Sequence, residues 1–324
     1  MNDDRHPAVS EPTSAGCALT FDVEEWFHAG SLAIPPHEWD SIPSRLDGPI
    51  GEILSLLTEH ETSATFFMLG WIAARRPQLV RKIHAAGHEI ASHGHWHRRV
   101  DRQGRNAFSD DVRRAKATIE DAIGEAVIGY RAPGYSIDSQ APWAFDELEA
   151  AGFAYDSSIY PARAPHGGYG VSGAPLRPHL VRSGLCEFPL PTWRVLGRRF
   201  PAATGAYLRL LPLAATRLAI EQNLRHEIHV VVNIHPWELD VDQPRREVSP
   251  WTALRHYGGL RGLRGKLARL LESFRFGPLR DMHAQYMARS ACRPRDRDPR
   301  PVDPSEFGLL TENFAHAIDD SQRH

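Results

Sequence analysis

Short apolar runs alternate with amphipathic stretches of helical length, from about residue 17 to about residue 275. The clearest apolar run reads IHVVVNI, at Ile228–Ile234. Such alternation is typical of a parallel sheet whose strands are joined by helices, so the pattern predicts an α/β fold. We predict strands at Cys17–Phe21, Ala64–Leu69, Glu89–Ser92, Val127–Tyr130, Phe153–Tyr155, Leu185–Pro189 and Ile228–Ile234.

The stretches between these runs have the periodicity and end signals of helices. Gly87, Gly124 and Gly152 each follow such a stretch, and glycine is a common helix stop. Ser109, followed by two aspartates, predicts a capped helix start with negative charge in its first turn. The predicted helices are Gly48–Glu59, Pro77–Ala86, Ser109–Ile123, Pro142–Ala151 and Gly205–Asn223.

The C-terminal part of the chain changes character. Leu260–Phe276 is basic and amphipathic, and we interpret it as a packed helix with a solvated basic face, with a membrane-surface or partner helix as the alternative. From residue 281 the sequence becomes polar and rich in proline and arginine. We predict a flexible segment over 1–16, one catalytic domain with a C-terminal helical extension over 17–280, and a loosely attached polar tail over 281–324.

Composition excludes several classes of protein. The 324 residues are 42% hydrophobic and 24% charged, as in ordinary globular proteins. A net charge of −2 gives no general attraction to nucleic acid or to an anionic membrane. No apolar run approaches the ~20 residues of a membrane span, and the acidic start shows no export signal, so we expect a cytoplasmic protein. Three widely separated cysteines fit reduced thiols: Cys17, Cys186 and Cys292.

Polar clusters directly follow four of the predicted strands. In parallel α/β barrels the active site is built from residues at the carboxyl ends of several strands, so these clusters are candidates for one site. They are Asp22-Val23-Glu24-Glu25, His93-Gly94-His95-Trp96-His97, Arg131-Ala132-Pro133-Gly134 and His235-Pro236-Trp237-Glu238.

The histidine cluster has the spacing of a metal-binding pair. His93 and His97 are separated by three residues, which lets both imidazoles bind one ion, although His95 between them offers another pairing. Spacing alone leaves a metal site and a surface or core-edge role equally open. Strand alternation points Asp22 and Glu24 to one face, and two histidines with one carboxylate make a catalytic zinc site that keeps an open position. The other carboxylate is then free to act as a base.

Two further residues could take part in catalysis. His235 has an unperturbed pKa of ~6.5 and could protonate a leaving group, and the planar guanidinium of Arg131 could orient a carboxylate. Taken alone, each residue also fits a purely structural role.

The ordered segments TFDVEEWFH, SATFFMLGW, HEIASHGHWH, YRAPGYSI and NIHPWELD resemble the motifs of the polysaccharide deacetylases of carbohydrate esterase family 4, the NodB-homology family. The resemblance covers about residues 18–240. Further segments, among them YDSSIYP and RHYGGL, are similar to a subgroup encoded with bacterial exopolysaccharide and exosortase loci.

This resemblance implies a distorted TIM-like (β/α)7 barrel and a divalent metal, usually zinc, with Co²⁺ or another divalent ion as alternatives. It implies hydrolysis of N-acetyl groups on a polysaccharide or oligosaccharide, with release of acetate. By position, Asp22 matches the catalytic base and His93 and His97 match the metal ligands. Arg131 matches the residue that orients the base, His235 matches the catalytic acid, and the backbone N–H of Tyr135 matches the oxyanion donor.

One departure concerns the third metal ligand, because Val23 stands where the family has a metal-binding aspartate. Glu24 is the first choice as its substitute and Glu25 the second. Asp156 is a candidate for tuning His235. Trp193 and Trp237 could form an apolar wall for the substrate or pack in the core.

Other activities fit the same pattern. A small-molecule amidase or deformylase, or an O-acetyl esterase, would use the same ligands, and a carbohydrate-binding relative without catalysis is a third possibility. The partners we expect are N-acetylated saccharides, with no nucleic acid and no membrane span, and the sequence favours no oligomeric state.

Overall fold

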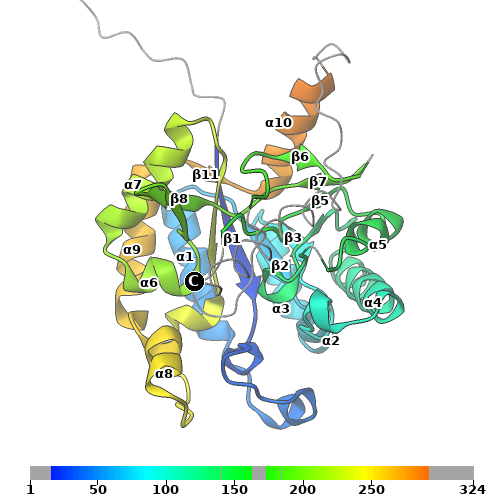
Figure 1. Ribbon diagram of the computed structural model, residues 1–324. Coiled ribbons are helices and arrows are strands. Elements are labelled where there is room, and N and C mark those ends of the chain that lie inside the picture. Colours follow the sequence, from blue (N-terminus) through cyan, green and yellow to red (C-terminus); the bar gives the residue numbers. More distant parts are fainter. Residues whose placement is uncertain (1–15, 139, 163–172, 183, 292–324) are drawn as a thin grey trace, which may run out of the picture.

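The computed structural model describes residues 16–138, 140–162, 173–182 and 184–291. Within them, a nine-stranded sheet has the order β10-β1-β2-β3-β4-β5-β7-β6, and β11 pairs with β1. The pairings from β10 to β7 are parallel, and β6 runs antiparallel to β7. The sheet is curled and helices cover its outside, as in a partly open barrel (Figure 1). The predicted distorted α/β barrel is therefore confirmed.

All seven predicted strands are present. They form β1 (Cys17–Val23), β2 (Thr65–Met68), β3 (Glu89–Ser92), β4 (Gly129–Tyr130), β5 (Tyr155–Asp156), β7 (Cys186–Glu187) and β10 (Val230–Ile234). Four short strands were not predicted: β6 (His179–Leu180), β11 (Phe276–Gly277), and β8 (Thr192–Val195) and β9 (Arg198–Pro201), which form a hairpin.

The described residues contain every predicted helix, with two corrections, and three further helices that were not predicted, at Gly70–Arg75, Pro250–Tyr257 and Leu279–Ala291. The helices are α1 (Asp47–Glu59), α2 (Gly70–Arg75), α3 (Pro77–Ala85), α4 (Arg105–Ile123), α5 (Ala144–Ala150), α6 (Gly205–Leu210), α7 (Leu213–Arg225), α8 (Pro250–Tyr257), α9 (Leu260–Ser273) and α10 (Leu279–Ala291). Helix α4 begins at Arg105, so Ser109 does not cap it. The helix predicted at Gly205–Asn223 is two helices, because Leu211 before Pro212 has extended backbone (φ −75°, ψ 149°).

Short 3-10 helices connect several of these elements. Two lie after β1, and the others follow β3, β4 and β10. They are η1 (Trp26–His28), η2 (Pro36–Ser41), η3 (Val100–Arg102), η4 (Pro133–Tyr135) and η5 (Pro236–Leu239).

Strand β1 shows how the sheet separates two environments. Leu19, Phe21 and Val23 belong to the large apolar cluster that includes the flanking helices. The alternate residue Ala18 belongs to the smaller cluster inside the curl, and Asp22 lies on this same face. The interior of the curl is therefore apolar at the amino ends of the strands and polar at their carboxyl ends.

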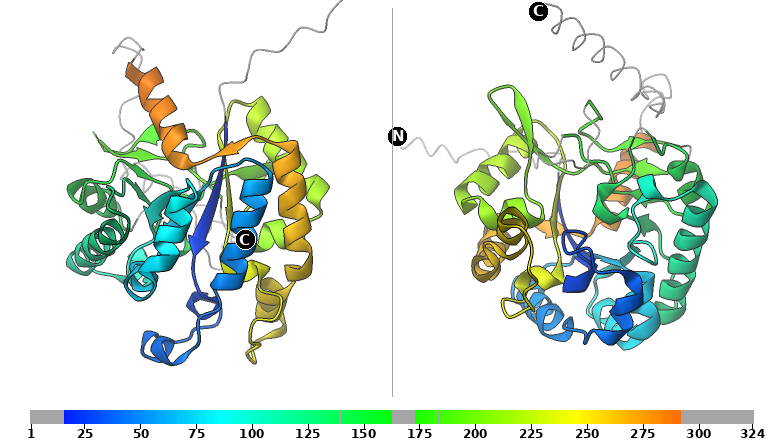
Figure 2. Two further views of the ribbon diagram at one scale, coloured as in Figure 1. Left: turned by 180° about the vertical axis from the view of Figure 1, so that it is seen from behind. Right: turned by 60° about the horizontal axis from the view of Figure 1, so that its bottom comes forward.

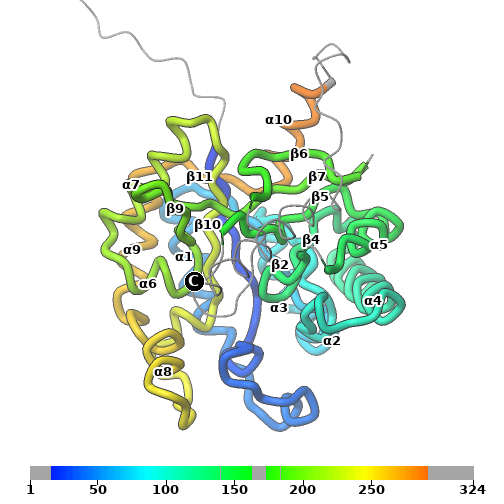
Figure 3. Tube along the Cα trace, viewed as in Figure 1, coloured from blue at the N-terminus to red at the C-terminus, as the bar shows by residue number. Residues whose placement is uncertain are grey.

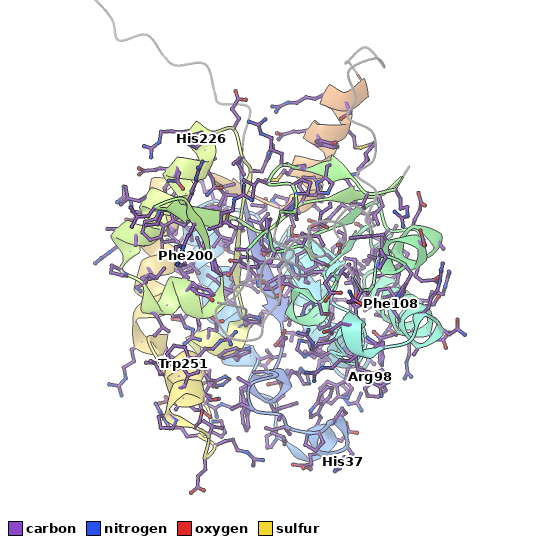
Figure 4. The ribbon with its side chains drawn as sticks, viewed as in Figure 1. His37, Arg98, Phe108, Phe200, His226 and Trp251 are labelled. Atoms are coloured by element: carbon purple, nitrogen blue, oxygen red, sulfur yellow. The ribbon has the colours of Figure 1, made fainter. Side chains whose placement is uncertain are left out.

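The two ends of the sheet carry different segments. Helix α10 lies at the end opposite α8, and η2 and α8 extend from the carboxyl-end side (Figure 1). The view onto that end shows the helices arranged around the sheet (Figure 2), and the Cα trace shows the segments after β1 and after β10 on the same side (Figure 3). In Figure 4, Phe200 and Trp251 mark the flank formed by the C-terminal half of the chain, and Phe108 and Arg98 mark the opposite flank.

The predicted tail requires a correction at its start. Residues 281–291 continue helix α10, and Met282 is buried in the interior cluster beside Leu279. Side chains of the barrel hold the start of this helix: Thr65 Oγ1 accepts a hydrogen bond from the Leu279 N–H (2.7 Å), and Glu89 accepts one from the Arg280 N–H (3.0 Å). This helix was not predicted because the segment is polar in composition. Residues 1–15 and 292–324, with most of both predicted terminal segments and Cys292, lie outside the described residues.

The expectations for the basic amphipathic stretch and for two of the cysteines agree with the structure. Leu260–Ser273 is a packed helix whose Leu263, Leu267 and Leu270 are buried. Cys17 and Cys186 are buried free thiols. Among the described residues, no helix combines the length and apolar character needed to cross a membrane.

Candidate active site

The four predicted polar clusters lie together at the carboxyl ends of neighbouring parallel strands. Asp22 is in β1 and Glu24 directly follows it; His93 follows β3, Arg131 follows β4 and His235 follows β10. Because β10, β1, β2, β3 and β4 are consecutive neighbours in the sheet, these side chains converge.

Glu24 and the two histidines form a candidate metal site. Glu24 Oε1 lies 3.1 Å from His93 Nε2 and 2.8 Å from His97 Nε2. The potential ligand atoms of the three residues all lie within 4.8 Å of one another. Two imidazoles and one carboxylate match the donors of catalytic zinc sites.

Hydrogen bonds orient the groups of this site. His93 Nδ1 lies 2.9 Å from the Arg131 carbonyl oxygen and donates to it, which directs Nε2 toward Glu24. His97 Nε2 is buried and makes no hydrogen bond of proper geometry among the described residues. Burial raises the pKa of Glu24, but the charges of His97 and His235 outweigh it and hold this pKa well below its usual value.

Glu25 lies outside this group. Its Oε2 accepts a hydrogen bond from the Arg45 backbone N–H (3.1 Å), and burial raises its pKa. Of the two carboxylates considered as the third ligand, Glu24 is therefore the one beside the histidines. Val23 is fully buried in the outer cluster, which explains why its neighbour on the inner face carries the carboxylate.

Helix α4 holds the loop that carries the histidines. Asp111 accepts hydrogen bonds from the backbone N–H groups of His95 (2.7 Å) and Trp96 (3.2 Å). The His95 side chain packs against α2, where a Cβ on Gly70 would come within 2.5 Å of its Nδ1. His95 is thus a structural residue, and His97, with φ of 51°, turns toward Glu24.

Asp22 is fixed through both of its oxygens. Arg131 Nη1 donates to Oδ1 (2.8 Å), and Asn233 Nδ2 donates to Oδ2 (2.8 Å). Burial raises the pKa of Asp22, but the Arg131 guanidinium and nearby histidines outweigh it, so the pKa lies below its usual value. Arg131 itself is fully buried, 4.0 Å above the Phe67 ring.

His235 completes the site with a partner that the sequence analysis missed. Its Nδ1 lies 2.7 Å from Glu238 Oε1, and its Nε2 lies 3.8 Å from Asp22 Oδ2 and 3.7 Å from Glu24 Oε1. Burial lowers the pKa of His235, but the negative charges of these three carboxylates outweigh it and raise the pKa to about 9.

The role considered for Asp156 is wrong. Asp156 Oδ1 accepts a hydrogen bond from Ser158 (2.6 Å), and the carboxyl that acts on the pKa of Asp156 is that of Glu187. The i, i+3 spacing of His235 and Glu238 in the 3-10 turn η5 was the available signal for the real partner.

Tyr135 uses both of its polar groups within the protein. Its backbone N–H donates to the Ala132 carbonyl oxygen (3.0 Å), and its hydroxyl accepts a hydrogen bond from Asn233 Nδ2 (2.7 Å). The N–H expected to bind an oxyanion is therefore engaged in a turn. Asn233, which the sequence analysis also missed, links Tyr135 to Asp22.

The two tryptophans differ in environment. Trp237 is buried and stacks between His235 (ring centroids 5.3 Å apart) and His256 (4.4 Å). Trp193 is partly exposed and belongs to β8. Of the two interpretations of Trp237, the packed one therefore holds.

Comparisons with known proteins agree with this geometry. Residues 39–154 match the family model described as polysaccharide deacetylase, and residues 157–284 match a model described as a domain of unknown function (DUF3473). A chitooligosaccharide deacetylase of Sinorhizobium fredii is 37% identical over 106 residues, which are 32% of this chain and 47% of the relative. A peptidoglycan-N-acetylglucosamine deacetylase of Bacillus cereus is 30% identical over 111 residues, 33% of this chain and 50% of the relative. The chain thus spans about half the length of the curated relatives it matches.

Solved structures show the same fold. A candidate polysaccharide deacetylase from Mycobacterium smegmatis has a TM-score of 0.58 at 20% identity, covering 87% of this chain and 94% of the other. The Puue allantoinase has a TM-score of 0.55 at 15% identity, covering 88% and 94%. The family model and the curated relatives thus show that about a third of this chain, residues 39–154, is similar to polysaccharide deacetylases.

Proposed function

We propose that this protein is a metal-dependent deacetylase that removes N-acetyl groups from amino-sugar units of a polysaccharide or its oligosaccharide precursor. One observation carries the proposal. Glu24, His93 and His97 form a candidate metal-binding group, and the polar atoms of Asp22, Glu24 and His235 all lie within 4.8 Å of one another. Amide hydrolysis of this kind uses a base, an acid and a Lewis-acidic ion around one carbonyl group, and these residues would supply the base, the acid and the ligands of the ion.

Glu24, His93 and His97 would hold the ion, and we propose zinc because of the two imidazole donors. A bound divalent ion polarises the acetamide carbonyl and lowers the pKa of water. Asp22 takes one proton from the attacking water. Arg131 and Asn233 keep this carboxylate ionised and fixed, so the proton goes to an oxygen of known position.

His235 gives a proton to the sugar nitrogen as the C–N bond breaks. Its Nδ1 faces Glu238, so Nε2 is the nitrogen directed at the reacting centre. The water supplies the oxygen of the acetate, and the products are acetate and a free amine. The reaction therefore turns a neutral substituent into a cation.

Tyr135 remains our proposed oxyanion donor with one condition. Its N–H donates to the Ala132 carbonyl oxygen, so it stabilises an oxyanion only by sharing that proton or by giving up the turn bond. One preorganised donor of this kind is worth ~2.7–4 kcal/mol in other hydrolases.

The natural substrate belongs to the proposal as well. We propose a bacterial exopolysaccharide, on the resemblance of YDSSIYP and RHYGGL to the exopolysaccharide-associated subgroup. The cytoplasmic location stays a prediction. The alternative of an inactive relative rested on the missing carboxylate at Val23, and in our proposal Glu24 takes the place of that carboxylate.

The test is acetate release by the zinc-loaded protein from an N-acetylated chitooligosaccharide. We expect activity that a chelator removes and zinc restores, and that falls by at least ~100-fold in His93→Ala and Asp22→Asn. His84→Ala is the matched control, since His84 pairs with Glu125 at the surface. Full activity of His93→Ala would refute the proposed site. Turnover of allantoin or of an O-acetylated sugar, without any amide cleavage on the oligosaccharide, would favour the alternative substrates.

A further inference from the structure

Arg209 lies behind the candidate acid, and its side chain donates hydrogen bonds to Glu238, Arg255 and Gly258, which are not part of the candidate metal-binding group. It belongs to α6, and its side chain is almost completely buried. An arginine keeps its charge at any pH at which proteins fold, so a buried guanidinium needs acceptors for its donors. The structure supplies them from two directions.

The first direction is Glu238. Arg209 Nε donates to Glu238 Oε2 (3.2 Å), and both side chains are 1% exposed. The other oxygen of the same carboxylate, Oε1, faces His235 Nδ1 at 2.7 Å. Glu238 therefore uses one oxygen for the arginine and one for the histidine.

The second direction is the end of α8. Arg209 Nη2 donates to the Arg255 carbonyl oxygen (2.7 Å), and Nη1 donates to that of Gly258. Lys266 Nζ fixes the same segment by donating to the carbonyl oxygens of Arg209 (2.7 Å) and Leu211 (2.7 Å). The guanidinium is thus held independently of Glu238, and it can in turn hold Glu238.

The charges around His235 explain why Glu238 needs a cation of its own. Three carboxylates surround the imidazole: Asp22, Glu24 and Glu238. Asp22 has Arg131 as its own cation, and Glu24 has the metal-binding histidines. Without Arg209, Glu238 would be the one buried carboxylate of the three without a cation other than His235 itself. A carboxylate in that state turns away or takes up a proton.

We propose that Arg209 is a positioning residue that acts through Glu238: it fixes the carboxylate so that His235 presents Nε2 to the reacting centre. The proposal rests on the proposed function, in which His235 is the acid. It also gives a role to residues 157–284, which match only a model of unknown function, because Arg209, Glu238, His235 and Asn233 all lie within that segment.

The backbone supports this interpretation. A Cβ at Gly205 would lie 3.3 Å from Glu238 Oε1 and 3.8 Å from His235 Cε1, so the start of α6 packs directly against the pair. A Cβ at Gly259, where φ is +74°, would lie 2.7 Å from the Arg209 carbonyl oxygen. The chain passes close to Arg209 only because glycine occupies this position.

The experiment compares Arg209→Gln, Arg209→Lys, Glu238→Gln and the double variant Arg209→Gln/Glu238→Gln. The matched control is Glu52→Gln, which breaks the exposed ion pair of Glu52 with Arg264. We measure kcat and KM for acetate release, and the zinc content of each variant. We expect kcat to fall about tenfold in Arg209→Gln and in Glu238→Gln, with KM and zinc content unchanged, and to recover in part in Arg209→Lys. The double variant should be no slower than Glu238→Gln, because Arg209 acts only through Glu238.

A second readout does not depend on activity. In protein labelled with ¹⁵N-histidine, a ring N–H that donates to a carboxylate gives a proton signal far downfield, whether the ring is neutral or charged. The signal of His235 is assigned by its loss in His235→Asn. We expect it to move upfield in Arg209→Gln and Glu238→Gln, and to stay in place in Glu52→Gln.

Several outcomes would overturn the proposal. These are an unchanged kcat and an unchanged His235 signal in Arg209→Gln, or losses that multiply in the double variant. If Arg209→Gln does not fold, the double variant tests the proposal in its place, since it leaves no unpaired buried charge. A His235 signal or a kcat in the double variant that differs from that of Glu238→Gln would refute the proposal. If the wild-type protein releases no acetate, the proposed function fails, but the His235 signal still tests Arg209.

Discussion

Asp111 offers a sharp test of how the metal-binding loop is held. Its two oxygens accept hydrogen bonds from the His95 N–H (2.7 Å) and the Trp96 N–H (3.2 Å), between the two histidines of the candidate site. Asp111→Asn keeps one acceptor oxygen and places an NH₂ group against the other N–H. One hydrogen bond to a charged group is lost, which costs about 1.5–3 kcal/mol.

The lost free energy destabilises the loop conformation that brings His93 and His97 together. Because 1.4 kcal/mol corresponds to a factor of ten, zinc affinity should fall by about 10- to 100-fold, the usual range for partners behind metal ligands. The assay is competition with a zinc chelator, combined with urea unfolding of the metal-free protein. Asp110→Asn is the control, since Asp110 is exposed on the same helix. Equal zinc affinity in the two variants would show that the loop is held by other contacts.

Three further variants test other parts of the structure. Glu24→Gln should lower zinc affinity by at least about tenfold, while Glu25→Gln should leave it near the wild-type value, because Glu25 accepts a hydrogen bond from the Arg45 N–H. Competition with a chelator measures both affinities, and the reverse order would identify Glu25 as the ligand. Burial raises the pKa of Asp156 to about 6 and holds the pKa of Glu187 well above its usual value. The protonated pair therefore stabilises the folded state at low pH, and this contribution is lost as the pH rises from about 4 toward 6. In urea unfolding of the metal-free protein over this range, Glu187→Gln should lose less stability than the wild type, and equal slopes would refute this. Met282→Ala should lower the free energy of unfolding by about 2–5 kcal/mol, because Met282 is buried, and Met287→Ala on the same helix should change it little, because Met287 is exposed. Equal effects of the two substitutions in thermal unfolding would mean that α10 does not pack against the barrel.

Sequence periodicity was sufficient to predict the strands that build the site. These strands are buried along their whole length, and the two longest, β1 and β10, are mostly apolar, which marks them in the sequence. The hairpin of β8 and β9 escaped prediction because Arg194, Arg198 and Arg199 interrupt its apolar character. The break between α6 and α7 was predictable from Pro212, whose ring disfavours helical backbone at Leu211.

The site was harder to predict than the fold, because its supporting contacts join residues far apart in the sequence. Strand alternation correctly placed Asp22 and Glu24 on one face, since it depends only on local geometry. No local pattern could choose Asp111 as the support of the histidine loop, or Arg209 as the partner of Glu238. Those contacts depend on how α4 and α6 pack on the sheet, which periodicity does not specify.

The division of the site along the chain explains why a family match alone does not reveal it. Residues 39–154, which match the polysaccharide deacetylase model, contain His93, His97 and Arg131. The carboxylates of β1 precede that range, and His235 with Glu238 follows it, in the segment of unknown function. Since β1 lies between β10 and β2 in the sheet, the site exists only when all three parts are folded together. Neither matched segment should therefore bind the metal and cleave an amide when it is produced without the rest of the chain.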